Sequence, residues 1–234
     1  MGIHFTITPG IENRLLAWNE MARRQPPEKK TSRPCITISR EFGCQAYPLA
    51  EILHKRLNEL AESEEEWIVL DRLLLEKIAA ESGFAKADLE YITKVNPILQ
   101  TLIMTFMGRK HADPFVVFTY IRKTLRYFAK AGNSIIVGRG GACLTQDLPH
   151  VFHVRLVAPL SFKLGIIMKN LGLTEEEARA HIKARQFERD EFTRHFTQTD
   201  LSNPFLYHLL INNEKVTLDQ IADIIMEMIE NYPD

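Results

Sequence analysis

A chain of 234 residues is long enough to bury a substantial core, and it fits one α/β domain or two smaller ones. Hydrophobic residues make up 45% and charged residues 25%, a globular balance that excludes a disordered chain. The formal net charge of −1 and the lack of a long apolar run argue against a polyelectrolyte that coats nucleic acid and against a membrane protein. The three cysteines have neither metal-ligand spacing nor an even number for disulfides, which suits the reducing cytoplasm.

The N-terminal part of the chain differs in character from the rest. Residues 11–24 have apolar side chains at helical spacing, and a polar stretch with three prolines follows over residues 25–34. We therefore expect a helical appendage and linker over residues 1–33 and one main domain over residues 34–234.

Strands and helices alternate along the main domain. Strands are predicted over residues 35–39, 67–70, 134–138, 151–157 and 206–211. Helices are predicted over residues 49–60, 73–81, 89–95 and 115–130, and after the capping boxes that begin at Thr174 and Thr217. This order predicts an α/β fold with a mainly parallel sheet and helices on both of its faces. Ligands of such sheets bind beyond the carboxyl ends of the strands.

The loop over residues 39–48 joins the first strand to a helix, a setting in which backbone amides and the helix dipole gather around phosphate. A Walker A loop would add a lysine and a Ser or Thr, but Ala46 and Pro48 stand at those places. Pro48 suits the first position of the helix. The alternative is a plain connection between strand and helix.

Two further strand ends carry arginine. In Gly138-Arg139-Gly140-Gly141 the glycines let the backbone approach a ligand, and Arg139 is well placed for a bidentate phosphate contact. Asp71-Arg72 ends the second strand, where Asp71 could equally cap a helix. A tight turn with a solvated Arg139 is the alternative for the glycine motif.

A cationic stretch follows the capping box at Thr174. Arg185 and Arg189 are four residues apart and share a helix face, whereas Arg194 would lie far round a straight helix. One interpretation is an arginine lid that offsets charge developing during phosphoryl transfer. The other is a solvated helix in which Glu188, Asp190 and Glu191 pair with the arginines.

These motifs occur in an order that resembles the cytidylate kinase-like family, relatives of the bacterial CMP kinases. The resemblance covers the chain from about Pro34 onward. It depends most on Ile38-Ser39-Arg40-Glu41-Phe42-Gly43 and Gly138-Arg139-Gly140-Gly141, with Asp71-Arg72, the lid arginines and residues 206–212 in support. It implies a P-loop NTPase-type three-layer fold with a helical insertion that binds a nucleoside monophosphate (NMP) and with a lid.

The resemblance also implies roles for single residues. The nucleotide phosphate loop maps onto Ser39, Arg40, Gly43, Cys44, Gln45, Ala46 and Tyr47, and NMP binding onto Asp71, Arg72, Arg139 and Gly140. Arg40, in place of the missing lysine, would act in catalysis with Arg185 and Arg189. ATP would enter as its Mg²⁺ complex, with no metal site of the protein's own. The sequence departs from the family at Gly43-Cys44-Gln45-Ala46, where relatives commonly read Gly-Ser-Gly-Gly, and at Gln186-Phe187-Glu188, where a lid aspartate is usual.

The resemblance thus implies phosphoryl transfer from ATP to a pyrimidine NMP such as CMP. Two alternatives stay open: a nucleotide-binding or sensing protein without catalysis, and a non-enzymatic interaction module that uses the N-terminal helix and the apolar residues 98–107. The expected partners are small-molecule nucleotides, with no nucleic acid or membrane, and a homo-oligomer is left open. If the loop wraps phosphate at a helix N-terminus, we also expect the Cys44 thiolate to be favoured and to react faster than buried Cys35.

Overall fold

The computed structural model describes residues 34–60, 66–71, 122, 125–138 and 140–231. The predictions for residues 1–33, 73–81, 89–95 and 98–107 lie outside this range, as do Arg72 and Arg139. The boundary between appendage and main domain therefore remains a prediction.

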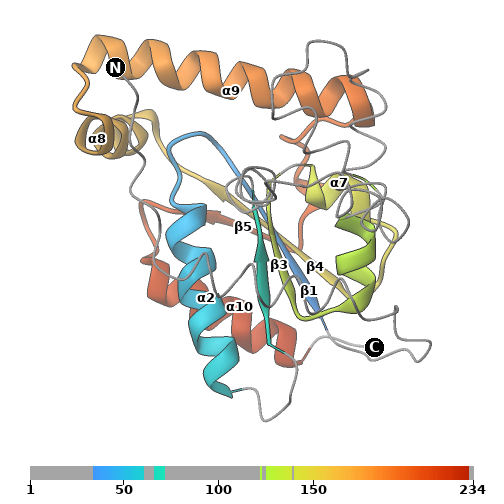
Figure 1. The fold of residues 1–234 in the computed structure, drawn as a ribbon. Coiled ribbons are helices and arrows are strands. Elements are labelled where there is room, and N and C mark those ends of the chain that lie inside the picture. Colours follow the sequence, from blue (N-terminus) through green and yellow to red (C-terminus); the bar gives the residue numbers. More distant parts are fainter. Residues whose placement is uncertain (1–33, 61–65, 72–121, 123–124, 139, 232–234) are drawn as a thin grey trace, which may run out of the picture.

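Five parallel strands form one sheet in the order β2-β3-β1-β4-β5 (Figure 1). They are β1 (Cys35–Arg40), β2 (Ile68–Leu70), β3 (Ser134–Val137), β4 (Val151–Val157) and β5 (Leu209–Asn212). The central strand β1 pairs in parallel with β3 on one side and with β4 on the other. The predicted α/β fold with a parallel sheet is thus confirmed.

Helices cover both faces of this sheet. The described helices are α2 (Ala46–Leu60), α7 (Gly141–Thr145), α8 (Leu160–Leu171), α9 (Glu175–Thr197) and α10 (Leu218–Glu230), together with helical residues 125–131. In Figure 1, α2 and α10 lie on one face and α7 lies on the other, while α8 and α9 form a hairpin across the carboxyl edge of the strands. Among the described residues, no helix has the length and apolar character that a membrane span requires.

Local chemistry explains where several elements begin. Both predicted capping boxes are present, with Thr174 before α9 and Thr217 before α10. Helix α2 begins at Ala46, so Pro48 is its third residue and not its first. The last strand begins at Leu209 and not at residue 206, because Asn203 caps a short 3₁₀ turn over Pro204–Leu206.

The two faces of the sheet differ in polarity. On the α2 and α10 face, Ile36, Ile38, Val154 and Leu156 belong to one apolar cluster that also holds residues of both helices. Side chains alternate between the faces of a strand, so the residues between these point to the α7 side. There β1 and β4 carry polar side chains that are nearly fully buried: Thr37, Ser39, His153 and Arg155.

His153 shows how this buried polar layer is satisfied. Its Nδ1 lies 2.7 Å from the Thr37 hydroxyl, and its ring stacks on that of His208 at 5.3 Å between centroids. Burial, and then the charge of His208, lower the pKa of His153 to about 4 from an ordinary value of 6.5. The ring is therefore neutral in the folded protein at pH 6, whereas an unfolded chain binds a proton there more readily.

The stability of the fold should consequently depend on pH. Between about 6.5 and 4 the unfolded state binds more protons at His153 than the folded state, so the free energy of unfolding should fall as the pH falls through this window. The loss should reach up to about 3 kcal/mol. Urea unfolding at a series of pH values tests this, with His153→Gln expected to give a flatter profile. Parallel profiles for the two proteins would contradict the assignment.

Candidate functional site

The loop between β1 and α2 has most of its backbone amides already bound by protein groups. The amide of Phe42 donates to Oε1 of Gln186 at 2.7 Å, and that of Gln45 donates to Oδ1 of Asn213 at 2.8 Å. The amides of Glu41 and Cys44 donate to backbone carbonyls. Within the described part of the chain, the amides of Gly43, Ala46 and Tyr47 have no such acceptor and remain for a ligand.

Phe42 fixes the loop to the α8–α9 hairpin. Its side chain packs against the apolar cluster that these two helices share. The Phe42 ring meets the edge of His181 at 5.4 Å, and Cζ of Arg189 lies 4.8 Å from its centroid. Two residues of α9 therefore hold Phe42 by aromatic and cation–π contacts, while a third, Gln186, binds its amide.

Lys163 of α8 makes the second link between hairpin and loop. Its Nζ lies 2.7 Å from a carboxylate oxygen of Glu41. A Cβ atom on Gly43 would lie 2.8 Å from Cβ of Lys163, and Gly43 has φ of 97°, so this position requires glycine. Because Glu41 is engaged by Lys163, the negative charge of its carboxylate is already compensated.

Arg40 connects the loop to the glycine turn that follows β3. A Cβ atom on Gly138 would lie only 1.7 Å from Nη1 of Arg40, so the guanidinium rests directly against this glycine. Gly138 and Gly140 both have positive φ, 74° and 70°. The structure thus brings together two predicted phosphate-binding segments, the β1–α2 loop and the Gly138 turn. Asp71 directly follows β2 and is 1% exposed.

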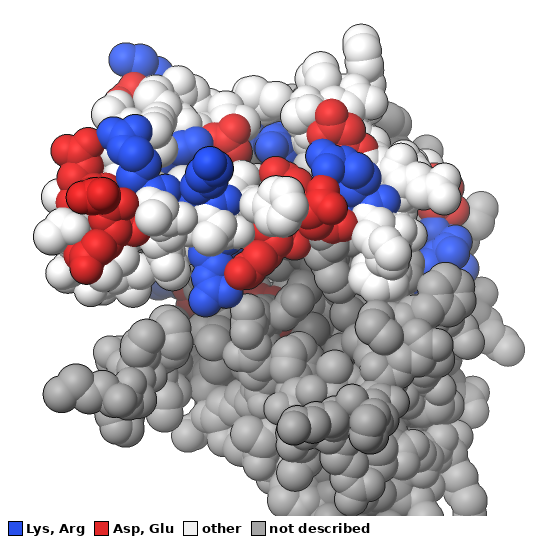
Figure 2. All heavy atoms as spheres, turned by 90° about the horizontal axis from the view of Figure 1, so that it is seen from above, with Lys and Arg blue, Asp and Glu red and all other residues white. Residues whose placement is uncertain are grey.

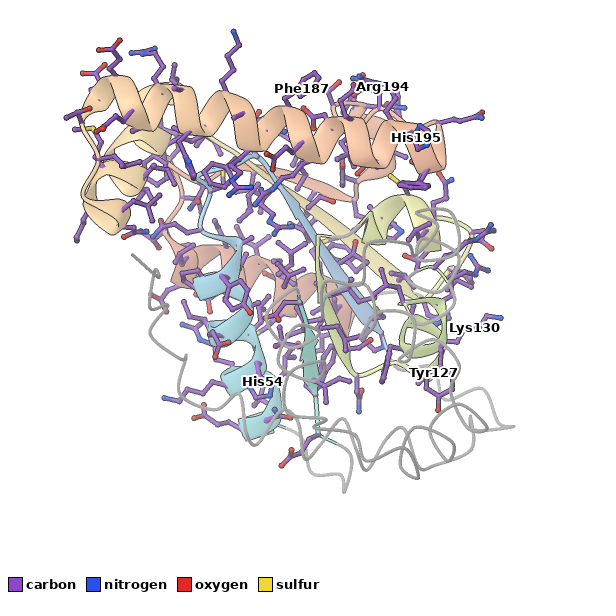
Figure 3. The ribbon with its side chains drawn as sticks, turned by 45° about the horizontal axis from the view of Figure 1, so that its top comes forward. His54, Tyr127, Lys130, Phe187, Arg194 and His195 are labelled. Carbon is purple, nitrogen blue, oxygen red and sulfur yellow. The ribbon has the colours of Figure 1, made fainter. Side chains whose placement is uncertain are left out.

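The arginines of α9 have different surroundings. Helix α9 is continuous from Glu175 to Thr197, so Arg194 is not brought to the loop. It pairs with Glu191 and projects, like Phe187, from the outer side of α9 (Figure 3). Arg185 pairs with Glu188 at 2.8 Å and is about half exposed. Arg189 alone of the three lies against the loop, on Phe42.

The outer face of α9 carries charges of both signs. Figure 2 shows lysine and arginine interleaved with aspartate and glutamate along this helix. Arg179 and Glu175 form a further pair at 2.8 Å. This face matches the solvated helix of the alternative interpretation, while the inner face holds the contacts to the loop.

The side chains of the remaining predicted loop residues are buried or packed against the protein, so a ligand would meet mainly their backbone. Ala46 is buried in the apolar cluster, and Tyr47 packs against that cluster with a buried hydroxyl that has no hydrogen-bond partner among the described residues. Ser39 is buried and lies within hydrogen-bonding reach of Tyr207. No group of three or more His, Cys, Asp or Glu side chains in the described residues is arranged to hold a metal ion.

Sequence reasoning missed three residues that shape this site: Lys163, Gln186 and Asn213. Gln186 stood out only as the residue in place of a lid aspartate. Asn213 directly follows β5, and a polar residue at the carboxyl end of a strand is a signal that could have identified it. Lys163 gave no signal, because a lysine early in an amphipathic helix is ordinary.

The expectation that the loop favours the Cys44 thiolate is contradicted, although the pKa of Cys44 stays below that of Cys35. Burial and the nearby Glu41 carboxylate raise the pKa of Cys44 to about 11, and the charge of Lys163 offsets only part of this. Burial raises the pKa of Cys35 further, to about 12. The partial charge of a helix terminus is smaller than these effects together.

Removing the Glu41 charge should therefore activate Cys44. In Glu41→Gln the second cause of the raised pKa is lost and Lys163 no longer has its partner, so maleimide labelling of Cys44 should become several-fold faster at pH 8. Peptide mass spectrometry identifies the labelled cysteine, and Cys35 is the internal control whose rate should stay low. Equal Cys44 rates in both proteins would show that Glu41 does not act on the thiol.

Comparison with known proteins agrees with this architecture. The fold resembles the crystal structure of an uncharacterized protein from Eubacterium ventriosum, with a TM-score of 0.59 and 21% identity over 85% of this chain and 98% of the other. A stretch of 99 residues is 26% identical to a uronate isomerase of Corynebacterium glutamicum, but it spans only 19% of that protein and 42% of this one. The model of the cytidylate kinase-like family matches residues 35–215. The chain therefore belongs to the cytidylate kinase-like family.

Proposed function

We propose that the protein transfers a phosphoryl group from ATP to a pyrimidine nucleoside monophosphate such as CMP. The observation that carries this proposal is the contact of Arg40 with Gly138. Phosphoryl transfer needs donor and acceptor phosphates side by side, and this contact joins the two segments that would hold them. A kinase-like use of nucleotides also agrees with the family.

The roles follow from the position of each group. The amides of Gly43, Ala46 and Tyr47 would donate to phosphates of ATP, with Arg40 supplying the cation that a Walker A lysine otherwise provides. Arg189 would compensate transition-state charge from above Phe42. Arg185, Asp71, Arg72, Arg139 and Gly140 keep the roles that the resemblance implies. Mg²⁺ would arrive bound to ATP and screen its phosphates, and we place the reaction in the cytoplasm.

A second function is favoured by the occupied amides of the loop. Gln186 and Asn213 bind donors that a phosphate loop would offer to nucleotide, and the loop lacks both lysine and a Ser or Thr for magnesium. A protein that binds nucleotide without turning it over fits these features. A coupled assay with a panel of NMPs, ATP and Mg²⁺ separates the two functions, because nucleotide binding without turnover supports the second.

The first test of this proposal uses two glycines of similar backbone conformation. Gly138→Ala places a methyl group on the Arg40 guanidinium, whereas Gly172, with φ of 65°, has no atom of the described residues within 4 Å of its would-be Cβ. Each variant should lose about 1–2 kcal/mol of stability from the left-handed backbone. Only Gly138→Ala should also weaken ATP binding, by about tenfold or more, measured by calorimetry.

The Arg40→Ala variant completes this test. If the methyl group acts by displacing Arg40, the loss in Gly138→Ala should not add to the loss in Arg40→Ala when the two are combined. Additive losses, or an unchanged ATP affinity in Gly138→Ala, would remove Arg40 from the phosphate site.

The second test addresses α9. Arg189→Ala should lower kcat roughly a hundredfold while changing the binding of ATP and CMP much less, because the proposed contact forms only as charge develops. Arg179→Ala is the matched control, since Arg179 lies on the same helix but pairs with Glu175 in solvent. Steady-state kinetics on both variants gives the comparison. A wild-type kcat for Arg189→Ala would show that Arg189 does not act in catalysis and that α9 has a structural role.

A further inference from the structure

Arg155 is a charged residue in the middle of a buried strand. It lies on β4 directly beside Ser39 of β1 and is only 5% exposed. Parallel strands covered on both faces are ordinarily apolar, so a guanidinium here departs from the pattern of its own sheet. The resemblance to the family assigns no role to this position.

Among the described residues, the guanidinium of Arg155 has one hydrogen bond and one cation–π contact, although it carries five N–H donors. Nη1 donates to the Tyr207 hydroxyl at 3.3 Å, and Cζ lies 5.5 Å from the centroid of the same ring. That hydroxyl donates in turn to the carbonyl of Leu201 at 2.9 Å. Arg155 forms no ion pair with any carboxylate in the described part of the chain.

Asp200 is an acidic residue whose pKa the charge of Arg155 influences, but it provides little compensation. Hydrogen bonds from Ser202 lower the pKa of Asp200 first, and the charges of Arg194 and Arg155 add a smaller effect. Asp200 is therefore close enough to sense the guanidinium, but its carboxylate is bound by Ser202 and exposed to solvent. It compensates Arg155 only weakly.

A buried cation with this little compensation is costly to the folded state. Removing an ion from water carries a large desolvation penalty. A single hydrogen bond to a charged group and one cation–π contact offset this penalty only in part. The contacts of Arg155 within the described residues include no opposite charge, whereas a bound anion would supply one together with hydrogen-bond acceptors.

The surroundings of Arg155 fit such an anion. Its charge is a minor influence that lowers the pKa of Cys44 in the β1–α2 loop and of Cys143 in α7, so the guanidinium is within electrostatic range of both elements. Helix α7 begins directly after the Gly138 turn, and Cγ2 of Thr193 in α9 would lie 4.0 Å from a Cβ atom on Gly140.

We propose that Arg155 binds a phosphate group at the α7 face of the sheet and that, in the proposed kinase function, this is the phosphate of the acceptor monophosphate. The second part rests on the proposed function, and the first does not. In that function Arg155 and the Gly138 turn bind the acceptor phosphate, whereas the loop amides bind the donor phosphates.

The experiment compares Arg155→Met with wild type, using inorganic phosphate and CMP as separate probes. Methionine fills a similar volume without charge, so in phosphate-free buffer the variant should be at least as stable as wild type. The Kd for phosphate and for CMP, from calorimetry and from the ligand-induced rise in Tm, should increase about tenfold to a hundredfold. Arg194→Met is the matched control, since Arg194 is exposed and paired with Glu191, and both Kd values should stay unchanged.

The outcomes separate this inference from the kinase proposal. An unchanged Kd for phosphate in Arg155→Met, or a wild-type protein that binds neither probe, overturns the inference. Phosphate binding that depends on Arg155 without CMP phosphorylation upholds it and counts against the kinase. If the methionine variant does not fold, Arg155→Lys decides: it keeps the charge but loses the planar donor fork, so phosphate binding should weaken, and an unaltered Kd contradicts the proposal.

Discussion

The insertion of Phe42 between α8 and α9 determines the conformation of the β1–α2 loop. Once this ring is seated, the Phe42 amide faces Gln186, Glu41 faces Lys163, and Gly43 has to pass Lys163 too closely for any side chain. The loop and the hairpin are therefore one packed unit. A movement of α9 as a lid would have to break the contacts to Phe42 or carry the loop with it, so opening of the site is coupled to the shape of the phosphate-binding backbone.

The sheet separates two kinds of chemistry. Its α2 and α10 face is apolar and packs with residues of both helices into one buried cluster. Its α7 face holds Thr37, Ser39, His153 and Arg155, which are buried but polar. His153, whose pKa burial lowers to about 4, forms a hydrogen bond with the Thr37 hydroxyl, so it is accommodated within the fold. Arg155 has no carboxylate partner among the described residues, and we propose that a bound phosphate compensates it. His153 and Arg155 lie two positions apart on β4. The first is a buried polar residue with a structural role, and we propose a ligand-binding role for the second.

Much of the fold could be predicted because its signals are local. Apolar runs gave the positions of all five described strands, and Thr174 and Thr217 with their partners three residues on predicted two helix starts that the structure confirms. The site was harder, since its decisive contacts join distant residues: Phe42 with Gln186, and Gln45 with Asn213. The raised pKa of Cys44 could not be predicted from the sequence either. It depends on burial and on Glu41, and the argument from the helix terminus included neither. The roles of Arg72 and Arg139 stay predictions.

The position of β1 in the sheet has a consequence for synthesis of the chain. Cys35 pairs beside Ser134, 99 residues later, and Thr37 meets His153 at a separation of 116 residues. At about 5–20 residues per second, the ribosome needs roughly 5–20 seconds to make the first partner strand. During this time β1 has two open hydrogen-bonding edges, and α2, made directly after it, can cover only one face. Nascent chains should therefore be most prone to aggregate before β3 emerges, and slowing elongation between β1 and β3 should lower the yield of folded protein more than slowing it after β4.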